Sequence, residues 1–175
     1  MSSSLNFKHQ VVTKAFSLPL ILLCIASALV QEFALTRLTL FNVSPDVITV
    51  FLAFVAVSAG QRSSTSFGFA LGILTGILSG NIGLDMLSRT VEGFIAGYFH
   101  IPEDSHATAK QKNRRFFSAI VVAGFCGNAV LATGYNPLGL LPAYRIVVLG
   151  LLEAFLTVIL AVILHWFFLK KSFAD

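Results

Sequence analysis

In this 175-residue chain, the residues best suited to a chemical role are ionisable and amide side chains that stand inside apolar segments. Arg89 and Glu92 stand three residues apart in one such segment, and Asn128 and Glu153 stand in two others. A charged side chain in hydrocarbon costs about 2.5–3.5 kcal/mol on insertion scales, so each of these residues calls for a partner or a function. Two interpretations stay open. The four side chains satisfy one another as polar contacts between helices, or they line a polar cavity that binds a small molecule or a partner.

Patterns typical of catalysis or metal binding are scarce. The four histidines are scattered along the chain. His100 and His106 with Glu103 and Asp104 lack close ligand spacing, which favours a solvated loop over a metal site. The chain contains no GxSxG, HExxH, phosphate-binding glycine loop or CxxC. We therefore predict a protein that is not an enzyme and that uses no cofactor or metal.

The composition sets the environment in which these charges must lie. Lys, Arg, Asp and Glu make up 11% of the chain, against about a quarter in a soluble domain, and 56% of the residues are hydrophobic. The 17 Phe exclude a disordered chain, and only two Cys exclude a disulfide scaffold. The net charge of +4 forms no basic face, which excludes a nucleic-acid partner. A small multi-pass membrane protein in contact with the lipid bilayer remains.

Six apolar segments are candidates for crossing a bilayer, which takes about 20 helical residues. The second segment opens with Ser44-Pro45-Asp46, where we expect Ser44 as N-cap and Pro45 at the first helical position. The fourth, with Arg89 and Glu92, is the weakest candidate. We predict an all-α integral membrane protein with a single polytopic domain over residues 1–175. Its six transmembrane helices are predicted at residues 15–30, 45–60, 66–83, 84–99, 116–134 and 146–168.

Lys and Arg in the connections predict the orientation, because they resist translocation. One side of the membrane would hold Lys8, Lys14, Arg62, Lys110, Lys112, Arg114, Arg115, Lys170 and Lys171, and the other Arg37 and Arg145. We therefore expect both termini and a loop over residues 100–115 in the cytoplasm. The basic run of this loop is interpreted as a topogenic signal against anionic headgroups, or as a docking site for a cytoplasmic partner.

The first 30 residues also have the three regions of a cleaved signal peptide, with Ala26-Ser27-Ala28 as a cleavage site. The apolar run continues beyond that site through Leu29 and Val30. This continuation favours an uncleaved first helix.

Glycines recur at a spacing of four in the third segment and again in the fourth. They are Gly68, Gly72, Gly76 and Gly80, followed by Gly93 and Gly97. Their missing side chains allow a neighbouring helix backbone to approach closely, which matters in lipid because hydrophobic burial drives little association there. The favoured interpretation is tight packing between the third and fourth helices. The alternative is a groove for the helix of a partner protein.

The glycine segment also carries a resemblance. The stretch from Gly68 to Gly80, followed by Gly83-Leu84-Asp85 and by Glu92-Gly93 with Gly97-Tyr98, resembles the central signature of the MreD family of bacterial rod shape-determining membrane proteins. Gln31 and Pro45-Asp46 stand where that family places similar residues. The resemblance covers residues 31–99. It departs at Gly76, where the family usually has Asp, and in a connection one residue shorter around Asn81.

The resemblance implies a non-enzymatic component of the cell-elongation machinery in the bacterial cytoplasmic (inner) membrane. Its implied partners are an MreC-like membrane-anchored scaffold, an MreB-like actin filament and the glycosyltransferase and transpeptidase pair that builds peptidoglycan. It would regulate cell shape by holding these partners. The alternative is the substrate-binding subunit of an energy-coupling-factor vitamin transporter, another class of six-helix membrane proteins, in which Arg89, Glu92, Asn128 and Glu153 would face a ligand.

Overall fold

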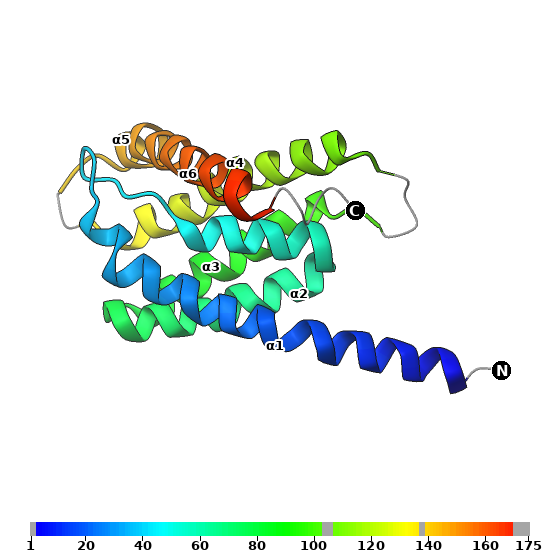
Figure 1. Cartoon of the computed structure of the whole chain (residues 1–175). Helices are drawn as coiled ribbons and strands as arrows, with labels where there is room; N and C mark the ends of the chain where they lie inside the picture. The colour runs from blue at the N-terminus through cyan, green and yellow to red at the C-terminus, as the bar shows by residue number, and fades with distance from the viewer. Residues whose placement is uncertain (1–2, 103–106, 137–138, 170–175) are drawn as a thin grey trace.

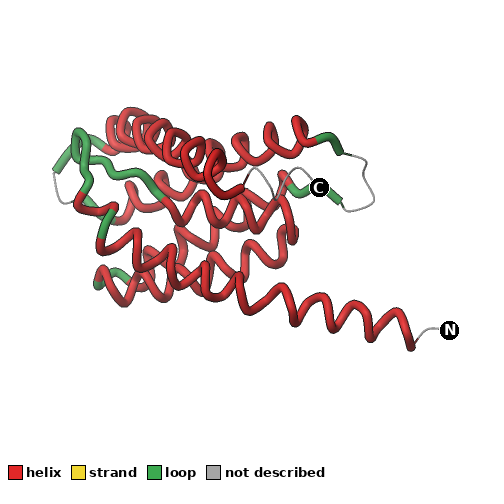
Figure 2. The backbone as a smooth tube through the Cα atoms, viewed as in Figure 1, coloured by secondary structure: helices red, strands yellow, loops and turns green. Residues whose placement is uncertain are grey.

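The structure, a computed structural model, is built of helices (Figures 1 and 2). It describes residues 3–102, 107–136 and 139–169, and it describes side chains between residues 18 and 167 of these ranges. The main helices are α1 (Ser3–Phe33), α2 (Val47–Ser79), α3 (Ile82–Ala96), α4 (Ala109–Gly134), α5 (Pro142–Tyr144) and α6 (Gly150–Leu164). Short 3-10 helices cover Leu35–Arg37 and Gly97–Phe99, and π-helical turns cover Arg145–Leu149 and His165–Leu169. The described residues contain no strand, which confirms the all-α prediction.

α2 reverses its direction at Gly60, whose backbone is non-helical with φ 85° and ψ 177°. The rings of Phe51 and Phe67 lie 5.7 Å apart between centroids, although a straight helix would separate residues at this spacing by about 24 Å. Figure 1 shows the two arms of α2 side by side. The predicted helices 45–60 and 66–83 therefore correspond to a first arm, residues 47–59, and a second arm, residues 61–79, of one helical hairpin.

The start of α2 corrects the predicted capping. Asp46, and not Ser44, is the N-cap: its Oδ1 accepts hydrogen bonds from the backbone N of Ile48 at 2.9 Å and of Thr49 at 3.4 Å. A carboxylate at this position satisfies backbone donors that have no partner within the helix. Pro45 consequently lies outside the helix, one residue before the cap.

The other helices start earlier than predicted. α4 begins seven residues before the predicted residue 116, because Thr108 and Gln111 form a reciprocal capping box ahead of its apolar part. α1 extends back to Ser3 from the predicted residue 15. The last helix, formed by α5, α6 and the two π-helical turns over residues 142–169, starts at Pro142. Proline is favoured at a first helical position, because its missing N–H would have no partner there. α3 replaces the predicted helix 84–99 and ends in a 3-10 turn.

Helices that follow one another run antiparallel. Ser88 Oγ donates to Gly127 O at 2.9 Å, and Arg115 Nη1 donates to His100 O at 2.8 Å, which sets α3 against α4. His165 of the last turn bonds Asn113 Oδ1 at 3.0 Å, which sets the last helix against α4. As a result the Gly60 turn, the end of α3 and the start of α4 lie at one end of the bundle, with the start of α1 (Figure 1).

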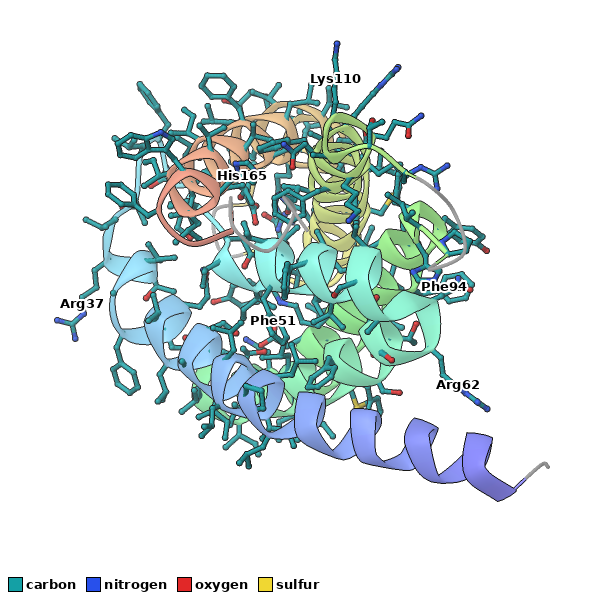
Figure 3. All side chains as sticks on the ribbon, turned by 45° about the vertical axis from the view of Figure 1, so that its right-hand side comes forward. Arg37, Phe51, Arg62, Phe94, Lys110 and His165 are labelled. Carbon is teal, nitrogen blue, oxygen red and sulfur yellow. The ribbon has the colours of Figure 1, made fainter. Side chains whose placement is uncertain are left out.

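Apart from the buried Arg89, the Lys and Arg side chains that the structure describes are unequally divided between the two ends of the bundle. The end with the Gly60 turn carries Arg62, Lys110, Lys112, Arg114 and Arg115. The opposite end, with the connections after α1 and α4, carries Arg37 and Arg145. Arg37, Arg62 and Lys110 project outward in Figure 3. The side chains of Lys8 and Lys14, the whole of Lys170 and Lys171, and positions 103–106 of the predicted cytoplasmic loop lie outside the described residues.

Within the described residues, four helices are long and apolar enough to cross a membrane: residues 18–37, 47–79, 109–134 and 142–167. α3 is not one of them, because it has 15 residues and includes Asp85, Arg89 and Glu92. The four helices are consistent with a multi-pass membrane protein. Apolar side chains also cover much of the outer surface, including Leu151, Phe155 and Trp166, as expected of a protein that faces lipid.

Two apolar clusters fill the bundle. One joins the first arm of α2 to α4 and α6 through Val50, Phe116, Ile120 and Ala161. The other joins α1 to both arms of α2 through Cys24, Phe51 and Leu71. Phe51 lies inside the bundle in Figure 3. Buried polar residues of α2 and α3, Thr49 and Glu92 among them, lie on helices that also contribute to these clusters.

Candidate functional site

A buried polar junction of Asp46, Thr49, Arg89 and Glu92 joins the first arm of α2 to α3. Arg89 Nη1 forms an ion pair with Asp46 Oδ2 and a second with Glu92, at 3.0 Å from Oε1 and 2.9 Å from Oε2. Thr49 Oγ1 lies 2.8 Å from Asp46 Oδ2 and 3.3 Å from Glu92 Oε2. One guanidinium therefore sits between two carboxylates, and a hydroxyl bridges the same two groups.

The helical period of α3 places its part of the junction on the inward face. Ser88, Arg89, Glu92, Gly93 and Ala96 are buried and recur at helical spacing. Glu92 is 2% exposed and Arg89 is 9% exposed. Charges buried to this degree are stable only when they are paired and hydrogen-bonded. The pairing with Asp46 and Thr49 meets that requirement.

Two more helices contact the junction. Thr157 Oγ1 of α6 accepts a hydrogen bond from the backbone N of Asp46 at 3.0 Å. On α4, a Cβ added at Gly127 would lie less than 3.0 Å from the carboxylate of Glu92, so only glycine leaves room for that carboxylate. The junction thus connects α2, α3, α4 and α6 through residues that are far apart in the sequence.

α1 is attached beside the junction through Gln31, which is buried. Its side-chain Oε1 accepts from the backbone N of Val47 at 2.9 Å, and its Nε2 donates to Pro45 O at 3.4 Å. Gln31 therefore holds the end of α1 to the residues that flank the Asp46 cap.

The four residues predicted to form one intramembrane polar cluster form two pairs. Arg89 and Glu92 belong to the junction, whereas Asn128 of α4 donates to Glu153 Oε2 of α6. Glu153 is close enough to Asp46, Arg89 and Glu92 to interact with them electrostatically. Every polar side-chain atom that is buried among the described residues has a hydrogen-bond partner. This arrangement matches the interpretation of polar contacts between helices rather than that of side chains lining a cavity.

The glycine seam is the close contact between the second arm of α2 and α3. A Cβ added at any of five glycines would lie less than 3.0 Å from backbone atoms of the facing helix. The five glycines, with the facing residue in each case, are Gly68 with Arg89, Gly72 with Met86, Gly76 with Ile82, Gly93 with Ser64, and Gly97 with Gln61. The seam lies between the two helices that the glycine spacing predicts to pack together.

Gly80 differs from the other predicted packing glycines. It has φ 81° and ends α2 as a left-handed C-cap, with its N donating to Gly76 O at 2.9 Å. A Cβ added there would meet nothing within 4 Å. Gly80 therefore serves the turn into α3 and not the seam, which corrects its predicted role.

The basic run also lies in a different element from the one predicted. Lys110, Lys112, Arg114 and Arg115 belong to the first turns of α4, so the connection from α3 to α4 is shorter than the predicted loop 100–115. Between the end of α3 and these turns lies a cavity of about 580 Å³.

Sequence reasoning identified Arg89 and Glu92 as a pair but did not connect them with Asp46 or Thr49. Asp46 was recognised as a helix-start acid and Gln31 as a family-like position, but neither Thr49 nor Thr157 stood out. Both are ordinary hydroxyl residues within apolar segments, where such side chains usually bond to their own helix. Charge balance gives no signal for Asp46 either, because Arg89 with Glu92 is already a neutral pair.

The charged groups of the junction bond to one another and to a hydroxyl. The carboxylates of the junction are held by Arg89 and Thr49, and no group of three His, Cys, Asp or Glu among the described residues is placed to bind a metal. The geometry of the junction is that of a buried polar contact between helices.

Searches against models of known families, curated proteins and solved structures find no significant match to this chain.

Proposed function

We propose that the chain is a non-enzymatic component of the bacterial cell-elongation machinery, which supports cell shape and lateral peptidoglycan synthesis by holding partners in the cytoplasmic membrane. The proposed partners are an MreC-like scaffold, an MreB-like filament and the peptidoglycan glycosyltransferase and transpeptidase pair. The proposal follows from the resemblance to the MreD family, because that resemblance is the one functional indication in the sequence.

One observation carries the proposal. The residues on which the resemblance rests lie far apart in the sequence but come together in the fold: Gln31 bonds the backbone beside Pro45-Asp46, and Arg89, which is not part of the resemblance, pairs with both Asp46 and Glu92. The glycines of the same segment form the seam next to the junction on α3. A pattern carried by one connected structural unit supports a shared fold more strongly than scattered matches would.

The proposed topology has six crossings with both termini in the cytoplasm. The reversal at Gly60 turns α2 into two crossings, and α3 supplies another between Gly80 and His100. The first arm is about 20 Å long, which is shorter than the about 30 Å of hydrocarbon, so Asp46 would lie below the outer membrane surface. The concentration of cations at the end with the Gly60 turn supports a cytoplasmic location for that end.

A holding role suits the distribution of contacts. The polar groups of the interior are used for helix-to-helix bonds, while the outer faces of α1 and of the last helix expose large apolar side chains such as Leu22 and Phe155. Helices of partner proteins could pack against such faces in the bilayer. The vitamin-transporter alternative receives no such support, since Arg89 and Glu92 bond to Asp46 and Thr49 instead of facing a ligand.

The test is depletion of the chain in a rod-shaped bacterium that encodes it, followed by complementation. We expect depleted cells to become round, and wild-type chain to restore rods. The informative variants replace outward residues, for example Phe155→Ala with Leu151→Ala, because they leave the seam and the junction intact. Loss of rod shape with normal membrane levels would place a partner contact on the last helix.

Crosslinking followed by purification from native membranes tests the proposed partners biochemically. Recovery of a membrane-anchored periplasmic scaffold supports the proposal. Cells that stay rod-shaped after depletion, or a vitamin that co-purifies tightly with a transporter ATPase module, would contradict it.

A further inference from the structure

The cavity between the end of α3 and the start of α4 combines an apolar floor with a cationic rim. Its apolar lining comes from Phe99, Ile101, Pro102 and Ala107, and its polar lining from Gln111, Arg114, Arg115 and Ser118. The volume of about 580 Å³ is typical of sites for small molecules. None of these residues belongs to the junction or to the seam.

The two arginines lie at the boundary between the polar and apolar parts of α4. The sequence from Ala109 to Arg115 is polar, and the apolar run begins at Phe116, which is fully buried. In a helix that crosses a bilayer, this boundary lies at the level of the lipid headgroups. The cavity therefore lies at the level of the headgroup phosphates, with apolar residues lining it beside the two arginines.

Arg115 is held in position by the fold. Its Nη1 donates to His100 O at 2.8 Å, across from α3 to α4. A guanidinium carries five N–H donors, so this bond orients Arg115 and uses one of them. Planar donors of this kind match phosphate oxygens, and Arg114 supplies a second guanidinium on the same rim.

We propose that this cavity binds an anionic phospholipid at the membrane surface, with its phosphate on Arg114 and Arg115 and the start of its acyl chain against Phe99 and Ile101. The apolar lining argues for a ligand with a hydrocarbon part, and the paired guanidinium groups argue for an anionic head. The proposal requires the chain to lie in a bilayer. It does not depend on a role in cell elongation, so a failure of one leaves the other standing.

Native mass spectrometry of the purified full-length chain tests the site, with phosphatidylglycerol and phosphatidylcholine of the same acyl chains as probes. We expect one phosphatidylglycerol to be retained, with about tenfold tighter binding than phosphatidylcholine. Arg114→Gln combined with Arg115→Gln should lower phosphatidylglycerol binding about tenfold. Lys110→Gln combined with Lys112→Gln is the matched control, because it removes the same charge from residues that do not line the cavity, and it should lower binding less than threefold.

A third variant, Ala107→Phe, fills the cavity without changing any charge and should also reduce binding about tenfold. Each variant is compared only if it elutes as a single species with wild-type helicity, and Arg114→Gln alone serves if the double arginine variant does not fold. Equal losses in the arginine and lysine pairs would overturn the proposal in favour of diffuse attraction to charge. Displacement of the lipid by millimolar inorganic phosphate would also overturn it, because the site would then take a free phosphate.

Discussion

The glycine seam and the polar junction use opposite means to hold helices against α3. At the seam, five glycines bring the backbones of α3 and the second arm of α2 into direct contact. At the junction, Arg89 and Glu92 bond to Asp46 and Thr49, with Thr157 and Gly127 contacting the same cluster from two other helices. The seam joins two helices, α2 and α3, whereas the junction joins four, α2, α3, α4 and α6.

The difference shows how each kind of contact fails. A seam without side chains is sensitive to added volume, because nothing at the contact can move aside. A buried ion cluster is sensitive to removal of one member, because the remaining charges lose their partner. The two regions should therefore respond to different substitutions.

The largest effect is expected at Arg89. Arg89→Met leaves Asp46 and Glu92 buried without a counter-charge, and it should lower the free energy of unfolding by about 3–5 kcal/mol. Denaturation of the purified chain with SDS in mixed micelles measures this loss. The control is a triple variant, Asp46→Asn with Arg89→Met and Glu92→Gln, which removes all three charges and should be more stable than the single variant. A single variant as stable as the wild type would contradict a buried ion cluster.

The seam should respond to one methyl group. Gly72→Ala places a Cβ against the backbone of Met86, so the helices must separate, and the free energy of unfolding should fall by about 1–3 kcal/mol. Gly83→Ala is the matched control on α3, because a Cβ there meets nothing within 4 Å. The same SDS titration should show the control close to wild type. Equal losses in the two variants would mean that the helices are not in backbone contact.

Gly80 tests backbone conformation alone, because a Cβ at this position has space but would have to adopt a positive φ. Gly80→Ala should destabilise by about 1 kcal/mol, since φ 81° is strained for a residue with a Cβ. Gly80→Asn should lose less, because Asn tolerates the left-handed region better than other residues. If alanine and asparagine are equally stable at this position in thermal unfolding, the left-handed cap is not maintained in the protein.

The smallest effect is expected at Thr157. Thr157→Val keeps the shape of the side chain and removes the acceptor of the Asp46 N–H, so a loss of about 0.6 kcal/mol is expected. Thr157→Ser retains the hydroxyl and serves as the comparison. A loss as large as that of Arg89→Met would show that α6 contributes much more to the junction than one hydrogen bond.

The seam was open to prediction because it follows from one short segment. The spacing of Gly68, Gly72 and Gly76 marks a face of a single helix, and its natural partner is the next helix along the chain. The junction could be predicted only in part: Arg89 and Glu92 are visible as a pair in one helix, but the contribution of Asp46 depends on how the first arm of α2 is placed against α3. No local pattern specifies that placement.

The helix boundaries were also predictable from the sequence only in part. Gly60 was expected to end a helix, and it does interrupt α2, but its left-handed backbone turns the chain directly into the second arm without the predicted connection. The early start of α4 depends on Thr108 and Gln111, which form a capping box of the expected residue types outside the apolar run. Hydropathy located the apolar parts of these helices, and the polar caps extended them.

Both regions depend on the reversal at Gly60, since without it the second arm could not return along the first and bring α3 to Asp46. The most direct test labels single cysteines at Arg62 and Asn81 with a membrane-impermeant maleimide, in a chain whose Cys24 and Cys126 are replaced by Ala. We predict labelling from opposite sides of the membrane, with Arg62→Cys reached from the side of the termini and Asn81→Cys from the other. Labelling of both positions from one side would contradict the reversal, and with it the arrangement of the seam and the junction.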